Sequence, residues 1–502
     1  MNKQVGSDVA RAAQKFMVHC REGAFHTETL DVIIDAAISE RLAQARLGTG
    51  ILFGQVVEPL SDTFLVQDRE VLHQVLAYLI SRIRILPGAR QFHEKLNQWG
   101  LRSEADLLNR VERISSDKRF EAGSIGNVTK VFILSRVTIG ADVLLNSPVI
   151  EKMKQRFPGA EIVFLGNEKN GALLKGSQPG VRVHSLLYHR RDVLLNRFLL
   201  WLDVVRAIEN ETRESGPAED YIIVNTDSRL LQSGLLPILP PFEEENRYFF
   251  RKPSVGRETW AGTSQAEDLI QWLETVFGAG SPAETVFPRL HLPAADIAFA
   301  KRVYEILKKA GKTFVVSLSL GVGGNQKKRV RFDSETVSGF EIGLIRELLS
   351  DGATLLLDKG SGAEEYERAE ALTKAVREMG FEAAEVTEEN PELIRKKHGE
   401  AKSHNIRLLT FRGGVSKFAA LIKSSDLYIG YDSLGQHLAG AVGRDVIVIF
   451  AGYHSDLFPQ RWKPLGSGSI DLVKAQCGPF SPERQDELVA EVFKIYKALR
   501  RT

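Results

Sequence analysis

The chain has 502 residues, of which 43% are hydrophobic and 26% are charged, as in an ordinary globular protein long enough for two or three domains. Its 66 Lys and Arg residues against 64 Asp and Glu residues give a formal net charge of +2. This balance argues against a strongly basic nucleic-acid binder, although local charged patches remain compatible with it.

The two cysteines, Cys20 and Cys477, stand far apart and show no metal-ligand spacing, so we expect neither a disulfide framework nor a structural zinc site. The first thirty residues lack the apolar segment of a signal peptide, and no uncharged run reaches the roughly eighteen residues of a membrane span. We therefore expect a cytoplasmic protein, with peripheral association at the inner face of the membrane as an additional option.

Residues 1–124 show apolar positions at the spacing of an α-helix, as in Leu30, Ile33, Ile34, Ala37 and Ile38. We find no nucleotide-binding motif in this part of the chain. The pattern predicts a mainly helical domain that packs on or precedes the main body. Recruitment of a partner is its alternative role.

From about residue 128 the pattern changes to short apolar strands that alternate with helices. The first set of strands is expected at 130–135, 162–166, 181–187 and 221–225. The second set is expected at 313–320, 354–357 and 408–411, followed by a strand that ends at Asp432-Ser433 and one at 446–450. Strands that alternate with helices indicate parallel sheets. Gly and Pro cluster at 280–295 and predict a linker there. We therefore predict an α/β fold with two domains, residues 125–290 and 291–502.

The most informative segment lies in the second domain, where a strand ends at Asp432-Ser433 and a helix follows at once. A helix N-terminus presents unpaired N–H groups and the positive end of the helix dipole. Such an end can bind a phosphate or diphosphate. We expect Ser433 or Asp432 to cap this helix and His437 to lie near its first turn. A helix histidine without a ligand is the alternative for His437.

Four other motifs follow strands, where loops of α/β proteins carry ligands. Asp142 begins a helix, either as a capping residue or as a general base. Lys327, Lys328 and Arg329 follow the Gly-rich loop 321–324, where a solvated basic run is the simplest interpretation. Glu364 follows the turn 360–362, where a first-turn glutamate is the simplest interpretation. Asn225 and Asp227 stand at the end of a strand of the first set.

The order and spacing of these motifs resemble glycosyltransferase family 9, the heptosyltransferase-like enzymes of lipopolysaccharide synthesis. The resemblance extends over residues 128–500 and rests on three matches in particular, Asp142 with Pro148, Asp432-Ser433 with His437-Leu438-Ala439, and Pro459 to Pro464 with Trp462. Two positions depart from the family. Ala141 stands where a glycine precedes the aspartate, and Leu434 stands where a glycine follows Ser433, with Gly435 one place later.

The resemblance implies a GT-B fold, in which two Rossmann-like domains face a cleft. It implies an inverting, metal-independent glycosyltransferase with no cofactor beyond its nucleotide-diphosphate sugar, an ADP-heptose-like donor, and with a glycolipid or glycan acceptor. Asp142 then matches the general base. The donor-binding residues are expected to be Lys327, Lys328, Glu364, Asp432, Ser433, Gly435 and His437, with Glu364 at a ribose or base. Asn225 and Asp227 are expected on the acceptor side. A catalytically silent binding or assembly protein and a nucleotide-sugar epimerase are the alternatives.

Overall fold

The computed structural model describes residues 2–116, 118–121, 126–188, 192–214, 220–252, 263–278, 286–309, 311, 314–323, 328–330, 337–388, 406–453 and 455–501. The chain divides into two compact units. Unit 1 comprises residues 1–138, 149–172 and 180–286, and unit 2 comprises residues 139–148, 173–179 and 287–502. The short segment 139–148, which includes Asp142, thus packs with the second unit.

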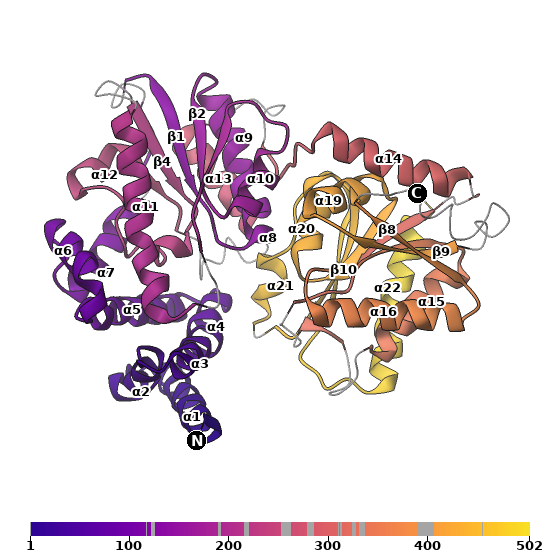
Figure 1. Ribbon diagram of the computed structural model, residues 1–502, viewed down its shortest axis with the longest axis horizontal. Coiled ribbons are helices and arrows are strands. Elements are labelled where there is room, and N and C mark those ends of the chain that lie inside the picture. The colour runs from indigo at the N-terminus through magenta and orange to yellow at the C-terminus, as the bar shows by residue number, and fades with distance from the viewer. Residues whose placement is uncertain are drawn as a thin grey trace. The chain divides into compact units, whose positions relative to one another are not determined.

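Unit 1 begins with the helical region predicted from the sequence. Its elements are α1 (Asn2–Arg21), α2 (Thr27–Ala37), α3 (Leu42–Leu52), a π-helical turn (Phe53–Val57), α4 (Glu58–Asp62), α5 (Val66–Ile83), α6 (Arg90–Gln98) and α7 (Glu104–Ile114). α7 starts with a capping box in which the Ser103 side chain accepts a hydrogen bond from the Asp106 backbone N–H. α5 runs across one end of the first sheet (Figure 1).

The sheet of unit 1 has five parallel strands in the order β3-β2-β1-β4-β5. They are β1 (Val128–Leu134), β2 (Glu161–Gly166), β3 (Val181–Ser185), β4 (Asp220–Asn225) and β5 (Tyr248–Phe250). The accompanying helices are α9 (Ser147–Arg156), α10 (Glu168–Lys175), α11 (Leu194–Glu214), α12 (Pro241–Arg247) and α13 (Gln265–Phe277). Both faces of a parallel sheet need such cover because its strands are apolar on both sides.

One hydrophobic core joins the helical region to this sheet. It includes Leu76 and Ile80 of α5, Phe198 and Trp201 of α11, and Phe132 of β1, all fully buried. The Trp201 ring meets Phe92 of α6 edge to face, with ring centroids 5.1 Å apart. The helical region is therefore an integral layer of unit 1 and not an appendage.

The sheet of unit 2 has seven parallel strands in the order β12-β11-β10-β6-β7-β9-β8. They are β6 (Val315–Ser319), β7 (Thr354–Asp358), β8 (Glu382–Thr387), β9 (Ile406–Arg412), β10 (Leu427–Tyr431), β11 (Asp445–Ala451) and β12 (Ile470–Ala475). Its helices are α14 (Ala294–Lys309), α15 (Gly339–Ser350), α16 (Ala363–Glu378), α19 (Val415–Ser424), α20 (Leu434–Ala441), α21 (Leu457–Arg461) and α22 (Pro482–Leu499).

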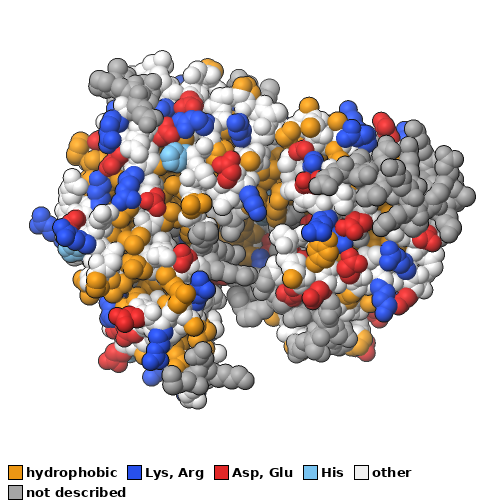
Figure 2. All heavy atoms as spheres, in the orientation of Figure 1, with side chains coloured by type: hydrophobic (Ala, Val, Ile, Leu, Met, Phe, Trp, Pro, Cys, Tyr) orange, Lys and Arg blue, Asp and Glu red, His pale blue; other side chains and the backbone are white. Residues whose placement is uncertain are grey.

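The predicted fold class is confirmed, because two parallel sheets with flanking helices follow a mainly helical region. Charged side chains of both signs are interspersed over the face shown in Figure 2, in keeping with the near-zero net charge. Among the described helices, none is at once long and apolar enough to cross a membrane.

Candidate functional site

The strand order of unit 2 changes direction at β6. The chain passes from β6 to β7 on one side, whereas β10, β11 and β12 lie on the other side. In open α/β sheets, ligands bind outside the carboxyl ends of the strands at such a switch point. The segment with Lys328 follows β6, and Asp432 follows β10 directly. The topology thus brings two of the predicted donor-site segments to one place.

Lys328 and Asp432 form an ion pair at this switch point. The Lys328 Nζ donates to Asp432 Oδ2 at 2.5 Å and lies 5.2 Å from the ring centroid of Phe458. The other carboxylate oxygen of Asp432 accepts from Gln436 Nε2, also at 2.5 Å. The Lys328 side chain is 25% exposed and that of Asp432 only 7%. The ammonium group is therefore held at the edge of the site with one side toward solvent.

The start of α20 differs from the sequence-based expectation in one respect. Ser433 occupies the N-cap position, but its side chain makes no capping hydrogen bond, and the carboxylate of Asp432 bonds to Lys328 and Gln436 instead. The prediction that Ser433 or Asp432 caps the helix is therefore not met in this part of the structure. No cap side chain occupies the first-turn N–H groups, so they can serve an anion.

His437 is buried on the same helix. Its Nε2 lies 3.3 Å from Gln436 Nε2, and its ring is 6.3 Å from that of Trp462, centroid to centroid. The pKa of His437 is lowered to about 4, mainly by burial, with Asp432 opposing the shift and Lys328 contributing to it. The imidazole is thus neutral near pH 7. Its Nδ1 is buried without a hydrogen-bond partner among the described residues, so this ring can still bond a ligand.

Asp142 lies in a helix that is distorted at that residue. The turn α8 (Ile139–Ala141) continues into the π-helical turn Asp142–Asn146 and then into α9. Asp142 is fully buried, and its Oδ1 accepts a hydrogen bond of 2.8 Å from Asn146 Nδ2. π-Helical turns inside α-helices are rare and are frequent at functional sites.

The turn that carries Asp142 packs against the start of α20 within unit 2. A Cβ atom added to Gly140 would lie 3.0 Å from His437 Cδ2 and 3.5 Å from Leu434 Cα. The absence of a side chain at Gly140 therefore permits the close approach. The candidate general base and the candidate phosphate cradle are neighbours in the same unit.

One of the two departures from the family pattern, Leu434, lies on α20, whereas Ala141 is the last residue of α8. Leu434 is the first residue of the helix and is half-buried. A Cβ atom at Gly435 would clash with the hydroxyl oxygen of Tyr428 on β10. Packing against Tyr428 therefore explains the glycine at 435.

The remaining donor-site predictions have different outcomes. Lys327 lies outside the described residues, and Glu364 is an exposed residue in the first turn of α16. Sequence reasoning missed Glu365, which accepts hydrogen bonds from the N–H groups of Gly362 at 3.0 Å and Gly323 at 3.0 Å. Glu365 thus ties together the two glycine-rich loops beside the switch point. The spacing of a capping box, Gly362 to Glu365, was the signal that could have found it.

The two residues predicted on the acceptor side belong to unit 1. Asn225 is fully buried, donates to the Tyr248 hydroxyl at 2.7 Å and accepts from the Ser228 N–H at 2.7 Å. It therefore holds the turn after β4. Asp227 is also buried and accepts from Arg69 Nη2 at 3.2 Å. Among the described residues of either unit, no group of three or more His, Cys, Asp or Glu side chains converges as metal ligands would.

Comparisons with known proteins identify similar solved structures but no sequence relatives. No protein-family model and no curated protein sequence matches the chain. The chain is similar to a family 9 glycosyltransferase from Veillonella parvula DSM 2008, at 13% identity over 74% of this chain and 100% of that chain, with a TM-score of 0.46. It is also similar to ADP-heptose LPS heptosyltransferase II of E. coli, at 13% identity over 72% and 99% of the chains and a TM-score of 0.44.

A third similar structure is the E. coli heptosyltransferase WaaC with ADP, at 15% identity over 74% of this chain and 100% of that chain, with a TM-score of 0.42. These structures come from the class of glycosyltransferases that the sequence motifs resemble. What the site of this chain does is inferred from its own residues.

Proposed function

We propose that this protein is a glycosyltransferase that moves a sugar from a nucleotide-diphosphate donor to a hydroxyl group of a glycan or glycolipid, with inversion and without a metal ion. One observation supports this most. The Lys328–Asp432 pair stands at the start of α20, and the turn with Asp142 packs against that same helix. A cationic cradle for a leaving diphosphate thus lies beside a carboxylate that can accept a proton.

The donor half of the site suits a diphosphate for electrostatic reasons. As the bond from the anomeric carbon to the diphosphate breaks, negative charge grows on the leaving oxygen. The Lys328 ammonium group and the first-turn N–H groups of α20 are placed to stabilise that charge. Asp432 holds the ammonium group in position, and His437 can donate a hydrogen bond without adding charge. The resemblance of the motifs favours an ADP-heptose-like donor.

The acceptor half of the reaction needs a base. In the proposed step the acceptor oxygen attacks the anomeric carbon from the face opposite the diphosphate, and its proton passes to the Asp142 carboxylate. A bond from the anomeric carbon to the acceptor oxygen forms while the bond to the diphosphate breaks, so the configuration inverts. Because Asp142 is fully buried, the side chains that cover it must move before an acceptor hydroxyl reaches it.

The proposal is tested by donor binding followed by transfer. ADP-, GDP-, UDP- and dTDP-linked sugars are compared by thermal shift, where a true donor at 100 times its Kd adds about 2.7 kcal/mol to the free energy of unfolding. The sugar that binds is then offered to glycan acceptors with wild-type protein and with Asp142→Asn. Lack of binding by all four classes contradicts the proposal.

One observation favours a second candidate, a silent protein that binds a nucleotide sugar without transferring it. Leu434 carries a side chain at the first position of α20, where the resembled family has glycine, and a Cβ there hinders close approach of a phosphate to the backbone. Donor binding by the wild type without transfer or donor hydrolysis identifies this case. Leu434→Gly then tests whether the side chain is the obstacle, because it should tighten donor binding.

A further inference from the structure

Unit 1 has a switch point of its own, between β1 and β4, because the strand order is β3-β2-β1-β4-β5. Arg136 follows β1, and Asp227 and Arg229 follow β4. Ligands bind at this edge in open α/β sheets. Val137 and Asp227 adopt positive φ angles of 80° and 67°, a backbone conformation that is costly for residues with side chains and that gathers at functional sites.

Three arginines surround the Asp227 carboxylate at this edge. Asp227 Oδ2 lies 3.2 Å from Arg69 Nη2 and 3.5 Å from Arg136 Nη1. Arg229 is the third, and its charge also acts on Asp227. The Arg69, Arg136 and Asp227 side chains are 12%, 8% and 5% exposed. We call these four residues, together with His73, the arginine cluster.

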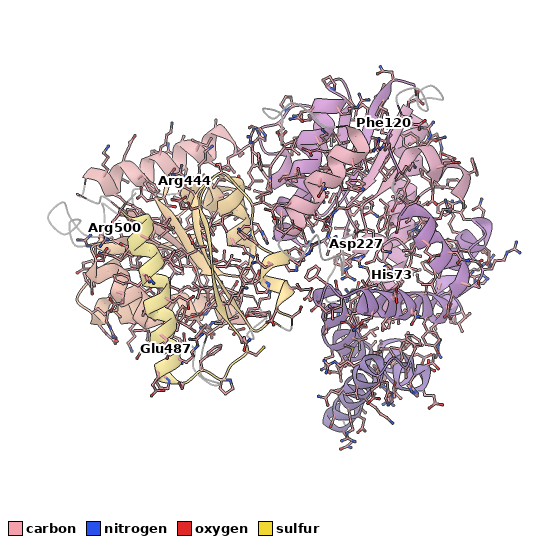
Figure 3. All side chains as sticks on the ribbon, turned by 180° about the vertical axis from the view of Figure 1, so that it is seen from behind. His73, Phe120, Asp227, Arg444, Glu487 and Arg500 are labelled. Atoms are coloured by element: carbon pink, nitrogen blue, oxygen red, sulfur yellow. The ribbon has the colours of Figure 1, made fainter. Side chains whose placement is uncertain are left out.

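Two members of the arginine cluster come from the helical region. Arg69 and His73 lie one turn apart on α5, which crosses the end of the sheet (Figure 1). Figure 3 shows His73 next to Asp227. Arg229 is anchored to the same region, because its Nη2 donates to Ser61 Oγ of α4 at 2.6 Å. The site is thus built jointly by the sheet edge and by the helices that precede it.

Burial and the neighbouring arginines both act on the Arg136 guanidinium, which remains charged near neutral pH. Burial lowers the pKa of Arg136 to about 10, and Arg229, Arg251 and Arg69 add to that effect against the attraction of Asp227. Arg251 has its own buried partner, Asp268, at 2.7 Å. Positive charges that are gathered in this way favour the arrival of an anion, because buried charges are stable only when they are paired.

The arginine cluster also holds buried polar atoms without a hydrogen-bond partner among the described residues. They are Arg229 Nη1, His73 Nε2 and Asp227 Oδ1. His73 is 7% exposed, and burial lowers its pKa to about 3, so its ring is neutral. An unpaired guanidinium N–H and a neutral imidazole can each donate to a ligand oxygen. Leaving such donors unpaired is costly, so a ligand that pairs with them gains affinity.

We propose that the arginine cluster binds a phosphate ester carried by the acceptor. The assignment of the phosphate to an acceptor rests on the proposed function. The binding of an anion rests on the residues of unit 1 alone. Guanidinium groups from separate helices and loops converge here. They suit a phosphate, because its oxygens can accept hydrogen bonds from more than one guanidinium group at once. The helical region thereby gains a role in recognising the acceptor, which the sequence left open.

The experiment measures the binding of inorganic phosphate and of a hexose 1-phosphate to the full chain by isothermal titration calorimetry at low ionic strength. Arg229→Gln is the main variant because this side chain is partly exposed, and Arg69→Gln is the second. Arg90→Gln, an exposed arginine of α6, is the control for a lost charge. Lys328→Ala removes the main cation of the donor site. Each cluster variant should weaken binding of the hexose phosphate about tenfold or more.

The outcomes separate the two proposals. Binding that is weakened by Arg229→Gln and Arg69→Gln, but not by Arg90→Gln or Lys328→Ala, supports an anion site at the arginine cluster. Tighter binding of the hexose phosphate than of inorganic phosphate supports the acceptor assignment, and equal binding overturns it in favour of a free ion. No binding, or binding that neither cluster variant weakens, overturns the site itself. If nucleotide sugars do not bind while the phosphate does, the proposed function fails and the anion site stands.

Discussion

Lys328→Met provides the sharpest test of the donor site. The substitution keeps an aliphatic stem beside Phe458 and removes only the ammonium group that donates to Asp432 at 2.5 Å. A charge-assisted hydrogen bond to phosphate contributes roughly 1.5–3 kcal/mol. Donor affinity should therefore fall about 10- to 150-fold.

The same substitution should have a smaller effect on folding. Removing one partner of a fully buried ion pair costs about 3–5 kcal/mol. Lys328 is 25% exposed and Asp432 keeps its bond from Gln436, so we expect a loss of about 1–2 kcal/mol in the free energy of unfolding. Urea denaturation measures this loss.

Calorimetric titration of a nucleotide diphosphate into both proteins measures the change in affinity. Lys374→Met is the matched control, because Lys374 forms an exposed pair with Glu378 in the same unit. That control should lose no affinity and at most about 0.5 kcal/mol of stability. If Lys328→Met binds nucleotide diphosphates as tightly as the wild type, the diphosphate does not lie at α20 and the model of the donor site is wrong.

Asp142→Asn should keep donor binding and folding but reduce transfer by about 100-fold or more, because the amide cannot accept a proton; full transfer activity in a radiolabelled-sugar assay contradicts its role as base. As the pH is lowered from 7 to 5, His437 of the unfolded chain binds a proton, whereas the buried His437 of the folded protein, with a pKa of about 4, stays neutral. The free energy of unfolding therefore falls as the pH falls. This histidine should account for about 2 kcal/mol of that fall, and His437→Gln should show a correspondingly flatter stability–pH profile in urea titrations. Gly435→Ala should destabilise the protein by about 1–3 kcal/mol, because its Cβ meets the Tyr428 hydroxyl; Gly159→Ala, with open space around it, should not.

Sequence patterns predicted the buried strands of the two described sheets well but missed the edge strands β5, β8 and β12, whereas the edge strand β3 was expected at 181–187. β1, β2, β10 and β11 are runs of apolar residues, because parallel strands in the middle of a sheet are covered on both faces. β8 and β12 lie at the edges of the second sheet, and each carries charged side chains, such as Glu385 and Lys474. Their mixed composition gave no apolar run to detect. β5 has only three residues, too few to establish a period.

The candidate donor site was predicted only in part, because sequence patterns reveal residues that are close along the chain and miss those that only the fold brings together. Asp432 and His437 lie in one continuous segment, so the spacing along the chain carried the signal. The partner of Asp432 had to be inferred from a strand more than a hundred residues earlier, and the resemblance of the motifs supplied Lys328. The arginine cluster was not found, because Arg69, Arg136 and Arg229 come from three distant segments. Only the topology of the sheet and the packing of α5 bring them together.

The single core that joins the helical region to the first sheet has a consequence during synthesis of the chain. The helices of residues 2–114 leave the ribosome well before α11, whose Phe198 and Trp201 belong to the same core and whose Trp201 ring meets Phe92. At roughly 5–20 residues per second, α11 is complete on the order of ten seconds after α5. During that interval the nascent helices expose their apolar faces. Until α11 and the sheet arrive, that exposed apolar surface makes this segment prone to aggregate.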